Sequence, residues 1–348
     1  MKGIREKFAL KETILKKITS IFLAVIMLLL PMMLLSCKTG GEGEETQTVY
    51  YTVTFNSNGG SEIPSQKSAA GAKVKIPAEP TYDNYVFDEW TYNGKAWDFN
   101  NDTVKGDMTL TAQWISADSL FKYSPVENTE NACITGFKDG YSPLPQNIVL
   151  PKIINGLNVV AVGEGAFKDL SSEDISSIVL HENIVSVGKQ AFENCKDITI
   201  TVKGALTSVG MCAFGSCNKL TSIVLGEGLE IVSPEAFIES GLTKITLPKT
   251  LRYIDEDAFK SCSSLGVIVM HPVESGTDTV IGNGAFRECT SVKTVFFYGE
   301  KAESDSILAR VSSGNDSFKN AKTSFYSEEK PTESGSFWHM VDGTPREW

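Results

Sequence analysis

A recurring apolar pattern organises the second half of the chain. Between Val159 and Gly299 an Ala-Phe pair returns six times, and a branched apolar residue stands five positions before each phenylalanine. The phenylalanines follow one another at intervals of 22 to 27 residues and are Phe167, Phe192, Phe214, Phe237, Phe259 and Phe286. A unit of this length cannot enclose its own core, so it must bury its apolar face against the units before and after it. The pattern therefore predicts a solenoid.

Each unit contains a short strand of alternating character. The clearest segments are ISSIVL from Ile175, LTSIVL from Leu220, LTKITL from Leu242, LGVIVM from Leu265 and VKTVFF from Val292. Successive side chains of a strand point to opposite faces, so each segment has an inward and an outward set. The inward set is expected to comprise Ile178, Ile223, Ile245 and Ile268. The outward set is expected to comprise Val179, Val224, Thr246, Val269 and Phe296.

The order of residues within the unit has a specific resemblance. It runs L-T-S-I-x-L, then a second apolar turn that ends in I-G, then A-F-x-x-C. This order resembles the BspA-type (treponemal-type) leucine-rich repeats of bacterial surface proteins, over roughly residues 148 to 348. The resemblance implies a fold that is mainly β with short helical turns, in a right-handed curved leucine-rich-repeat solenoid. It also implies a role in protein recognition or adhesion.

A different pattern precedes the solenoid and predicts a small β domain. The strand-like segments YTVTF, KVKIP, YVFDEW, KAWDF and LTAQW alternate with turn signals, the strongest of which is Asn93-Gly94. The aromatic residues of these segments are expected to form the core, and they are Phe55, Tyr85, Phe87, Trp90, Trp97, Phe99 and Trp114. The order VTF, NGG, Pro77 and Pro80, Y-x-F-x-x-W, WDF and T-L-x-A-x-W is similar to the Listeria-Bacteroides repeat, or internalin B-repeat. That resemblance implies a β-grasp-like stalk or spacer.

The N-terminus has the layout of a secretory signal. Six Lys or Arg residues precede the apolar run ITSIFLAVIMLLLPMMLLSC. An uncleaved membrane-spanning helix is the alternative, because the run approaches the length that crosses a bilayer. However, Pro31 interrupts the run, and its end resembles the cleavage box of bacterial lipoproteins, with Cys37 as the lipidated residue. The resemblance implies an exported chain that is lipid-anchored in the membrane of a bacterial envelope, and we expect exposure on the outer membrane.

These patterns divide the chain into six expected parts. They are a lipoprotein signal peptide at 1–36, a flexible tether at 37–48, the Listeria-Bacteroides/B-repeat domain at 49–115, an N-terminal cap at 116–147, the leucine-rich repeats at 148–299 and a C-terminal cap at 300–348. The tether is expected because its Gly-rich, acidic sequence contains no apolar residue. The caps are expected because a solenoid end otherwise exposes its core.

Charge and motifs argue against several functions. The net charge of −11 is the opposite of the basic surface that binds nucleic acid. His181, His271 and His339 lie far apart in the sequence and outside any Cys/His cluster, so we expect no metal site and no catalytic residues. The motifs GEG, GEG and GNG lack the third glycine of a phosphate loop, so we expect no cofactor.

The cysteines leave two interpretations open. Cys195 with Cys217, and Cys262 with Cys289, stand at the same position of adjacent units, three residues after the phenylalanine. A spacing of ~4.8 Å between strands would allow a disulfide. Leucine and serine occupy the same position in other units, however, which favours a small or apolar side chain and therefore free, buried thiols.

The outward set of strand residues is the candidate binding surface. Val179, Val224, Thr246, Val269 and Phe296 are mostly apolar on a face that should meet water. Cross-strand packing would explain them, but contiguous exposed apolar surface also marks interfaces. We expect a non-enzymatic surface lipoprotein that binds a host or bacterial surface protein through this set. The alternatives are a structural spacer without a specific partner and, third, an envelope hydrolase.

Overall fold

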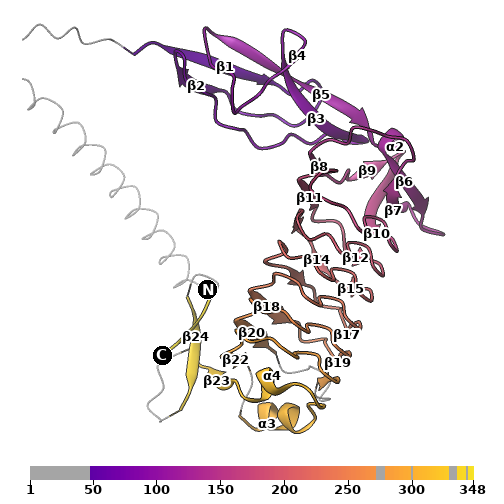
Figure 1. Ribbon diagram of the computed structural model, residues 1–348, viewed down its shortest axis with the longest axis vertical. Coiled ribbons are helices and arrows are strands. Elements are labelled where there is room, and N and C mark those ends of the chain that lie inside the picture. The colour runs from indigo at the N-terminus through magenta and orange to yellow at the C-terminus, as the bar shows by residue number, and fades with distance from the viewer. Residues whose placement is uncertain (1–47, 272–278, 299–300, 329–334, 342–343) are drawn as a thin grey trace, which may run out of the picture. The chain divides into compact units, whose positions relative to one another are not determined.

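The structure is a computed structural model that describes residues 48–271, 279–298, 301–328, 335–341 and 344–348. The expected signal peptide, Cys37 and all but the last residue of the expected tether lie outside the described residues. Within these ranges, no helix combines the length and the apolar character needed to cross a membrane. The fold is mainly β with a few short helices, as predicted (Figure 1).

The small domain is a five-stranded sheet in the order β2-β1-β5-β3-β4. Its strands are β1 (Tyr50–Asn56), β2 (Gln66–Ala69), β3 (Tyr85–Tyr92), β4 (Lys95–Ala96) and β5 (Met108–Ser116). β1 and β5 run parallel at the centre, and their neighbours β2 and β3 run antiparallel to them. β3 and β4 form the predicted hairpin, in which Asn93 and Gly94 have φ of 51° and 75°. These positive φ values are those that a two-residue hairpin turn requires.

Three expectations for this domain are wrong. Lys73–Pro77 forms no strand, because its carbonyl oxygens accept side-chain hydrogen bonds, such as Gln66 Nε2 to Lys75 O at 2.9 Å. The strand expected at KAWDF ends at Ala96, because the carboxylate of Asp98 closes a turn. Tyr85 is 37% exposed and lies outside the core. The other predicted aromatic residues do pack around the buried ring of Trp90 or against its neighbours.

The small domain and the solenoid share one core. α2 (Ala117–Leu120), β6 (Phe121–Pro125) and β7 (Asn131–Phe137) connect them, and β7 pairs in parallel with the first coil. The buried side chain of Val86, from β3, belongs to the same cluster as Ile148 of the first coil. The Asn84 N–H also donates to the Ile153 carbonyl at 3.2 Å. The two parts are therefore packed against each other directly.

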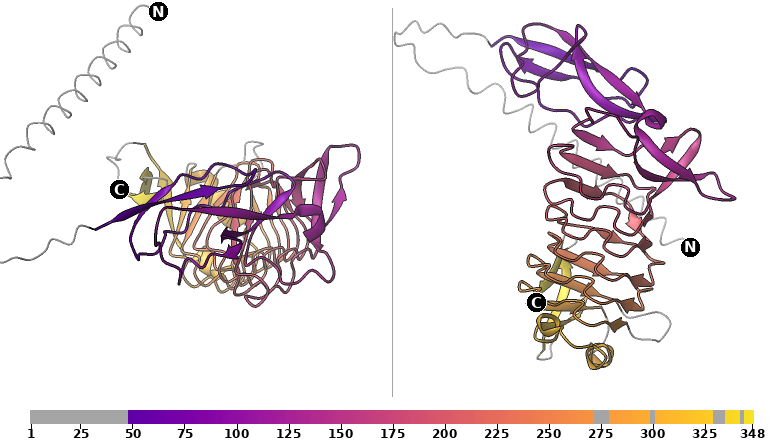
Figure 2. Two further views of the ribbon diagram at one scale, coloured as in Figure 1. Left: turned by 90° about the horizontal axis from the view of Figure 1, so that it is seen from above. Right: turned by 45° about the vertical axis from the view of Figure 1, so that its right-hand side comes forward.

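Two rows of parallel strands run along the solenoid on different sides (Figures 1 and 2). The first strand row comprises β8 (Asn147–Val149), β11 (Ser177–Leu180), β13 (Thr199–Val202), β14 (Ala205–Leu206), β16 (Val224–Leu225), β18 (Lys244–Leu247), β20 (Val267–Met270), β22 (Thr294–Phe297) and β23 (Lys322–Tyr326). The second strand row comprises β10 (Leu157–Val162), β12 (Ser186–Val187), β15 (Ser208–Val209), β17 (Ile231–Val232), β19 (Tyr253–Ile254) and β21 (Val280–Ile281). The short β9 (Ile153–Ile154) pairs antiparallel with β10. The C-terminal part adds α3 (Lys301–Ala309), α4 (Asp316–Lys319), β24 (Phe337–Val341) and β25 (Thr344–Glu347).

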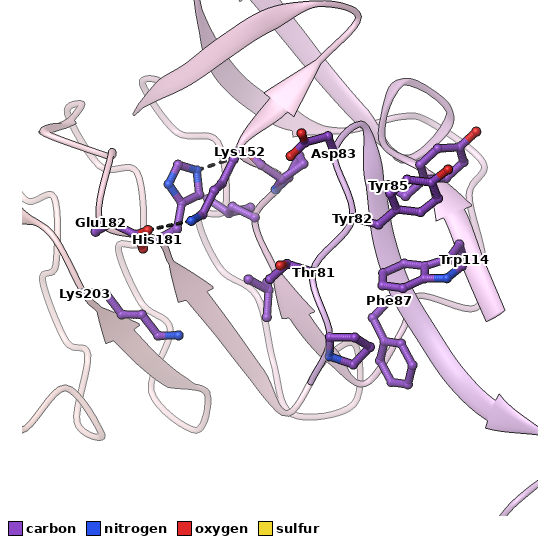
Figure 3. Close-up of a pocket in the computed structure, with 14 residues that line it drawn as sticks. Thr81, Tyr82, Asp83, Tyr85, Phe87, Trp114, Lys152, His181, Glu182 and Lys203 are labelled. Atoms are coloured by element: carbon purple, nitrogen blue, oxygen red, sulfur yellow. Dashed lines mark hydrogen bonds and ion pairs between the residues drawn. The ribbon is translucent and has the colours of Figure 1, made fainter. Parts of the chain in front are cut away.

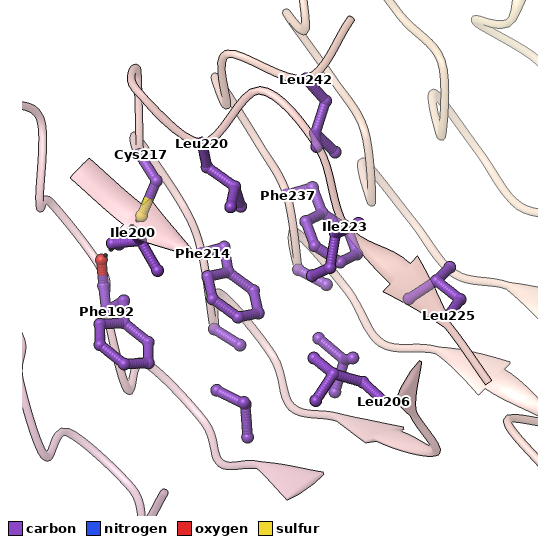
Figure 4. Close-up of a cluster of buried hydrophobic side chains, with 14 of the residues drawn as sticks. Phe192, Ile200, Leu206, Phe214, Cys217, Leu220, Ile223, Leu225, Phe237 and Leu242 are labelled. Carbon is purple, nitrogen blue, oxygen red and sulfur yellow. Dashed lines mark hydrogen bonds between the residues drawn. The ribbon is translucent and has the colours of Figure 1, made fainter. Parts of the chain in front are cut away.

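A stack of phenylalanine rings fills the interior (Figure 4). The six predicted phenylalanines are each at most 1% exposed, and adjacent ring centroids lie 5.2 to 5.6 Å apart. The stack continues beyond the predicted units, because Phe137 lies 5.1 Å from Phe167 and Phe318 lies 5.0 Å from Phe286. The stack thus spans the capping segments as well as the repeats.

The turns around these phenylalanines have a left-handed backbone at two recurring positions. Two residues before the ring, φ lies between 53° and 62° at Gly165, Gln190, Cys212, Glu235, Asp257 and Gly284. Two residues after it, φ lies between 55° and 64° at Asp169, Asn194, Ser216, Glu239, Ser261 and Glu288. Such values are uncommon for residues other than glycine. Hydrogen bonds between adjacent coils, such as Ser216 Oγ to Glu239 Oε2 at 2.9 Å, help hold these turns in place.

The cysteines of the repeat are held by the same stack. Cys195, Cys217, Cys262 and Cys289 each donate a hydrogen bond of 3.0 Å from Sγ to the carbonyl oxygen of a phenylalanine in the preceding coil. The six described cysteines are free thiols in the structure, and five of them are buried. Four of the six units therefore use this position for a thiol donor, whereas Leu170 and Ser240 fill it in the other two.

Candidate functional site

On the inward side of the first strand row, the predicted isoleucines are buried. Ile178, Ile245 and Ile268 are fully buried, and Ile223 is 8% exposed. The register also brings outward residues together, since Thr246 pairs with Val269 and Val269 pairs with Phe296. We call Val179, Thr201, Val224, Thr246, Val269 and Phe296 the outward column.

The two halves of the outward column differ in exposure. Val224 is 55% exposed, and Val179 and Thr246 are partly exposed. Val269 is 0% exposed and Phe296 is 7% exposed, so the expectation that these two residues face water is wrong. The five predicted residues therefore do not form one continuous exposed stripe.

The reason is the side chain of Trp338, which covers the C-terminal half of the outward column. Its ring is fully buried and lies edge-on to Phe296, with centroids 5.4 Å apart. Its Nε1–H donates to the Phe297 carbonyl oxygen at 3.0 Å. Tyr298 and Tyr326 pack on the same indole, with centroids 4.7 and 5.0 Å away. Phe296, the aromatic member of the expected binding set, is thus covered by the chain itself.

Two further features lie at this end of the solenoid. Phe297, the neighbour of Phe296 in β22, belongs to the main core and is 3% exposed. The loop that follows His271 includes residues 272–278, which lie outside the described residues. At the start of that loop, the His271 ring stacks on Tyr298 with centroids 4.0 Å apart.

The second strand row has an outward surface that the sequence analysis missed. Ile231 is 52% exposed and pairs in register with Tyr253, which pairs with Val280. Each of these residues stands six positions before a phenylalanine of the repeat. A comparison of that position across the units would therefore have predicted this surface from the sequence. Ile231 and Val224 belong to one coil and have similar exposure on different rows.

Two buried titratable groups, His181 and Cys195, are held by hydrogen bonds within the fold. His181 is 2% exposed, and its two ring nitrogens bond to the Pro151 carbonyl and the Asn183 N–H, at 3.1 and 3.2 Å. Burial lowers the pKa of His181 and therefore favours its neutral ring. Burial raises the pKa of the Cys195 thiol to about 12. Across the described residues, no group of three or more His, Cys, Asp or Glu side chains could hold a metal ion.

Comparisons with known proteins identify two parts of the chain. Residues 146–266 match the family BspA type leucine rich repeat region in six copies. Residues 51–113 match the Listeria-Bacteroides repeat domain. The chain therefore carries both kinds of repeat that its residues resemble.

Two curated proteins of Evansella cellulosilytica are similar over 67 residues, or 18% of this chain. One is described as a Gly-rich membrane protein and is 42% identical, and the other is described as a membrane protein and is 37% identical. This chain spans only 8% and 10% of their lengths.

Solved leucine-rich repeat structures are also similar. A protein from Bacteroides ovatus is 25% identical with a TM-score of 0.43, over 51% of this chain and 45% of that chain. The leucine-rich repeat protein of T. pallidum is 26% identical with a TM-score of 0.33, over 51% of this chain and 68% of that chain. A leucine-rich cell surface protein from Faecalibacterium prausnitzii is 16% identical with a TM-score of 0.30, over 52% of this chain and 69% of that chain.

Proposed function

We propose that this chain is a non-enzymatic protein of a bacterial cell envelope that binds a partner protein through the exposed half of the outward column. This half comprises Val179, Thr201, Val224 and Thr246. The observation that carries the proposal is the 55% exposure of the Val224 side chain on a row of ordered strands. Exposed apolar surface on such a framework is typical of an interface.

The position of the site follows from what the chain leaves uncovered. Trp338 closes the other half, so a partner can reach only the residues before Val269. Each strand of the exposed half is already paired in the solenoid, β11 with β13, β16 with β14 and β18 with β20. A partner would therefore bind without the entropic cost of ordering the receptor, which is a major cost of association.

The envelope location rests on the N-terminal sequence. Residues 1–36 have the layout of a signal peptide. Cys37 would carry the lipid that anchors the chain to the membrane. We further propose that the anchored chain is exposed on the outer membrane. The description of two partial relatives as membrane proteins supports this location. In this arrangement residues 49–115 are a stalk, and residues 116–147 and 300–348 cap the repeats at 148–299.

A photo-crosslinking amino acid placed in the full chain tests the binding surface. One variant carries it at Val224 and its matched control carries it at Ile231, because the two positions share a coil and are 55% and 52% exposed. Both variants are displayed on cells, illuminated with candidate surface proteins of host or bacterial origin, and analysed for covalent adducts. We expect an adduct to one defined protein from position 224 and none from position 231.

The outcomes separate the proposed function from its alternative. Equal adducts at both positions, or adducts at position 231 alone, would contradict binding through the outward column. No adduct at either position, together with adhesion unchanged in Val224→Lys, would favour a structural spacer. Retention of the Val224→Lys fold is checked by its thermal unfolding, since a surface substitution usually changes stability by only about 0.5 kcal/mol.

A further inference from the structure

The small domain contains a pocket of about 440 Å³ at the end of its sheet that is farther from the solenoid. Its lining includes Tyr92, at the end of β3, and Met108, at the start of β5. These strands are antiparallel, and their other ends, at Tyr85 and Ser116, adjoin the helix α2 that leads to the solenoid. A volume of this size lies within the range of about 300 to 1,000 Å³ that is typical of small-molecule sites.

A smaller pocket, lined by both Tyr82 and Lys203, lies at the junction of the small domain with the first coils (Figure 3). Its volume is about 130 Å³, which is below the range of such sites. The side chains of Glu182 and Lys203 lie on one side of the segment around Thr81. The rings of Tyr82 and Tyr85 project from its other side, so one ligand could not rest on these rings and also reach the charged groups.

Two aromatic side chains at right angles line the larger pocket, and we call Tyr92 and Trp97 the aromatic corner. Their ring centroids lie 6.0 Å apart, with an interplanar angle of 85°. Tyr92 is 37% exposed and Trp97 is half-buried, so the corner is open to a ligand. The main chain holds it in place, because the Trp97 N–H donates to the Trp90 carbonyl at 2.8 Å.

The rest of the lining is mostly polar and comes from the segment between β4 and β5. Asn101, Asp102, Thr103 and Lys105 contribute to it. A closed turn holds the start of this segment. The Asp98 N–H donates to Asp102 Oδ2 at 2.9 Å, and Asn101 Nδ2 donates to Asp98 Oδ2 at 2.7 Å.

Val104 holds the middle of the same segment. Its side chain is 0% exposed and belongs to the core of the small domain. Its N–H donates to the Ala72 carbonyl at 2.9 Å, and its carbonyl accepts from the Gly71 N–H at 2.7 Å. The polar lining is therefore ordered before a ligand arrives, which lowers the entropic cost of binding.

The charges of the lining restrict the chemistry of a ligand. Neither Asp102 nor Lys105 forms an ion pair with any residue that the structure describes. The carboxylate would repel an anion, and the ammonium group would repel a cation. A wholly apolar ligand would remove water from both groups without replacing its hydrogen bonds, which is costly. A neutral polyol fits, because hydroxyl groups donate to a carboxylate and accept from an ammonium group.

We propose that this pocket binds a neutral sugar residue of a glycan. The C–H groups on one face of the sugar ring pack on the aromatic corner, because the negative face of an aromatic ring attracts their positive edges. The hydroxyl groups of the sugar bond to the polar lining, in which Asn101 and Thr103 supply neutral partners. Such a contact is weak, with a Kd of about 1 mM for a monosaccharide. The pocket and the outward column are separate, so a bound glycan would not compete with a protein on the solenoid.

The test uses the full chain and defined probes. Serum albumin conjugates that present glucose, galactose, mannose or N-acetylglucosamine are titrated over the immobilised protein, alongside conjugates of acidic and of basic sugars. Tyr92→Ala and Lys105→Met alter the pocket. Tyr85→Ala is the control for the first change, because Tyr85 lies on the same strand and is also 37% exposed, but does not line this pocket. Lys95→Met is the control for the second, because Lys95 is an exposed lysine of the same domain outside the lining.

We expect saturable binding of at least one neutral conjugate, with competition by the corresponding methyl glycoside. Tyr92→Ala and Lys105→Met should each weaken that binding about tenfold, and the two controls should leave it unchanged. Val224→Lys should also leave it unchanged, which separates this site from the outward column. Thermal unfolding of each variant confirms that the fold is retained.

Three results would overturn the proposal. The first is the absence of saturable binding to every neutral conjugate, and the second is stronger binding of the acidic or the basic conjugates. The third is a loss in Tyr92→Ala and Lys105→Met that is no greater than the loss in their controls.

Discussion

The indole of Trp338 lies edge-on to the ring of Phe296, with an interplanar angle of 68°. The two residues come from β24 and β22, which are separated in the sheet by β23. The contact removes the largest side chain of the outward column from water. It therefore sets the C-terminal limit of the surface that a partner can reach.

Replacing Trp338 by alanine should uncover this end of the solenoid. The change removes a fully buried side chain and its hydrogen bond to the Phe297 carbonyl, so we expect a loss of about 3 to 5 kcal/mol. Binding of a hydrophobic dye should increase, because Val269 and Phe296 become exposed. Trp348→Ala is the control, since Trp348 is 42% exposed. Equal melting and dye binding in the two variants would show that Trp338 is not a cover.

Phe259→Ala should interrupt the aromatic stack. Phe259 is 0% exposed and stacks on both neighbours, with centroids 5.2 Å away in each direction. Deleting such a ring should cost about 3 to 5 kcal/mol, measured by denaturant unfolding. Ile231→Ala, on an exposed position of the neighbouring coil, should cost within about 0.5 kcal/mol. A small loss in Phe259→Ala would mean that the coils close around the gap.

Stability should fall at alkaline pH because of the buried thiol of Cys195. Burial raises the pKa of Cys195 from 9.0 to about 12. The unfolded chain therefore releases this proton near pH 9 while the folded chain keeps it, so the stabilisation is complete below pH 9 and is lost as pH rises toward 12. Denaturant unfolding at several pH values should show this decline. Cys195→Ser should reduce its slope, and an unchanged slope would assign the decline to other groups.

Free thiols predict a specific alkylation pattern. The repeat cysteines Cys195, Cys217, Cys262 and Cys289 are buried and should react slowly with a thiol reagent in the folded protein. After unfolding without reductant, all six described cysteines should be modified, as read by intact mass. A mass lower by two or four hydrogens, mapping to Cys195 with Cys217 or to Cys262 with Cys289, would show that disulfides form in the exported protein.

Metabolic labelling with a fatty acid tests the anchor. The end of the apolar run at LLSC places Cys37 where a lipid would be attached, so Cys37→Ala should abolish the label. Cys133→Ala, which alters a cysteine of the described domain, should keep it. Labelling of Cys37→Ala at the level of the unaltered chain would end the lipoprotein proposal.

The repeat could be predicted from the sequence because each residue packs against the residues at the same position of the units before and after it. The inward isoleucines and the six phenylalanines follow from spacing alone. Phe318 escaped this reading because serine replaces the alanine before it and α3 lengthens its unit. Phe318 joins the stack because it covers the ring of Phe286, which would otherwise end the stack exposed.

The covered and open parts of the surface could not be predicted in this way. The position of Trp338 depends on a short pairing of β23 with β24, which comprises two residue pairs, Phe325 with Phe337 and Tyr326 with Trp338. The pocket at the junction joins Tyr82 and Lys203, which lie in different domains and follow unrelated patterns. Both features arise from tertiary packing, which a local pattern does not encode.

The parallel pairing of β1 with β5 also determines how the molecule would bear a pulling force. The chain enters the small domain at the start of β1 and leaves it toward the solenoid at the end of β5. Tension between a membrane anchor and a captured partner would therefore slide these two strands along each other. The hydrogen bonds between the paired residues, from Val53 with Met108 to Asn56 with Thr111, would then bear the force together, in shear. They would not break one after another. Such a domain would act as a mechanical clamp between the cell and whatever the solenoid holds.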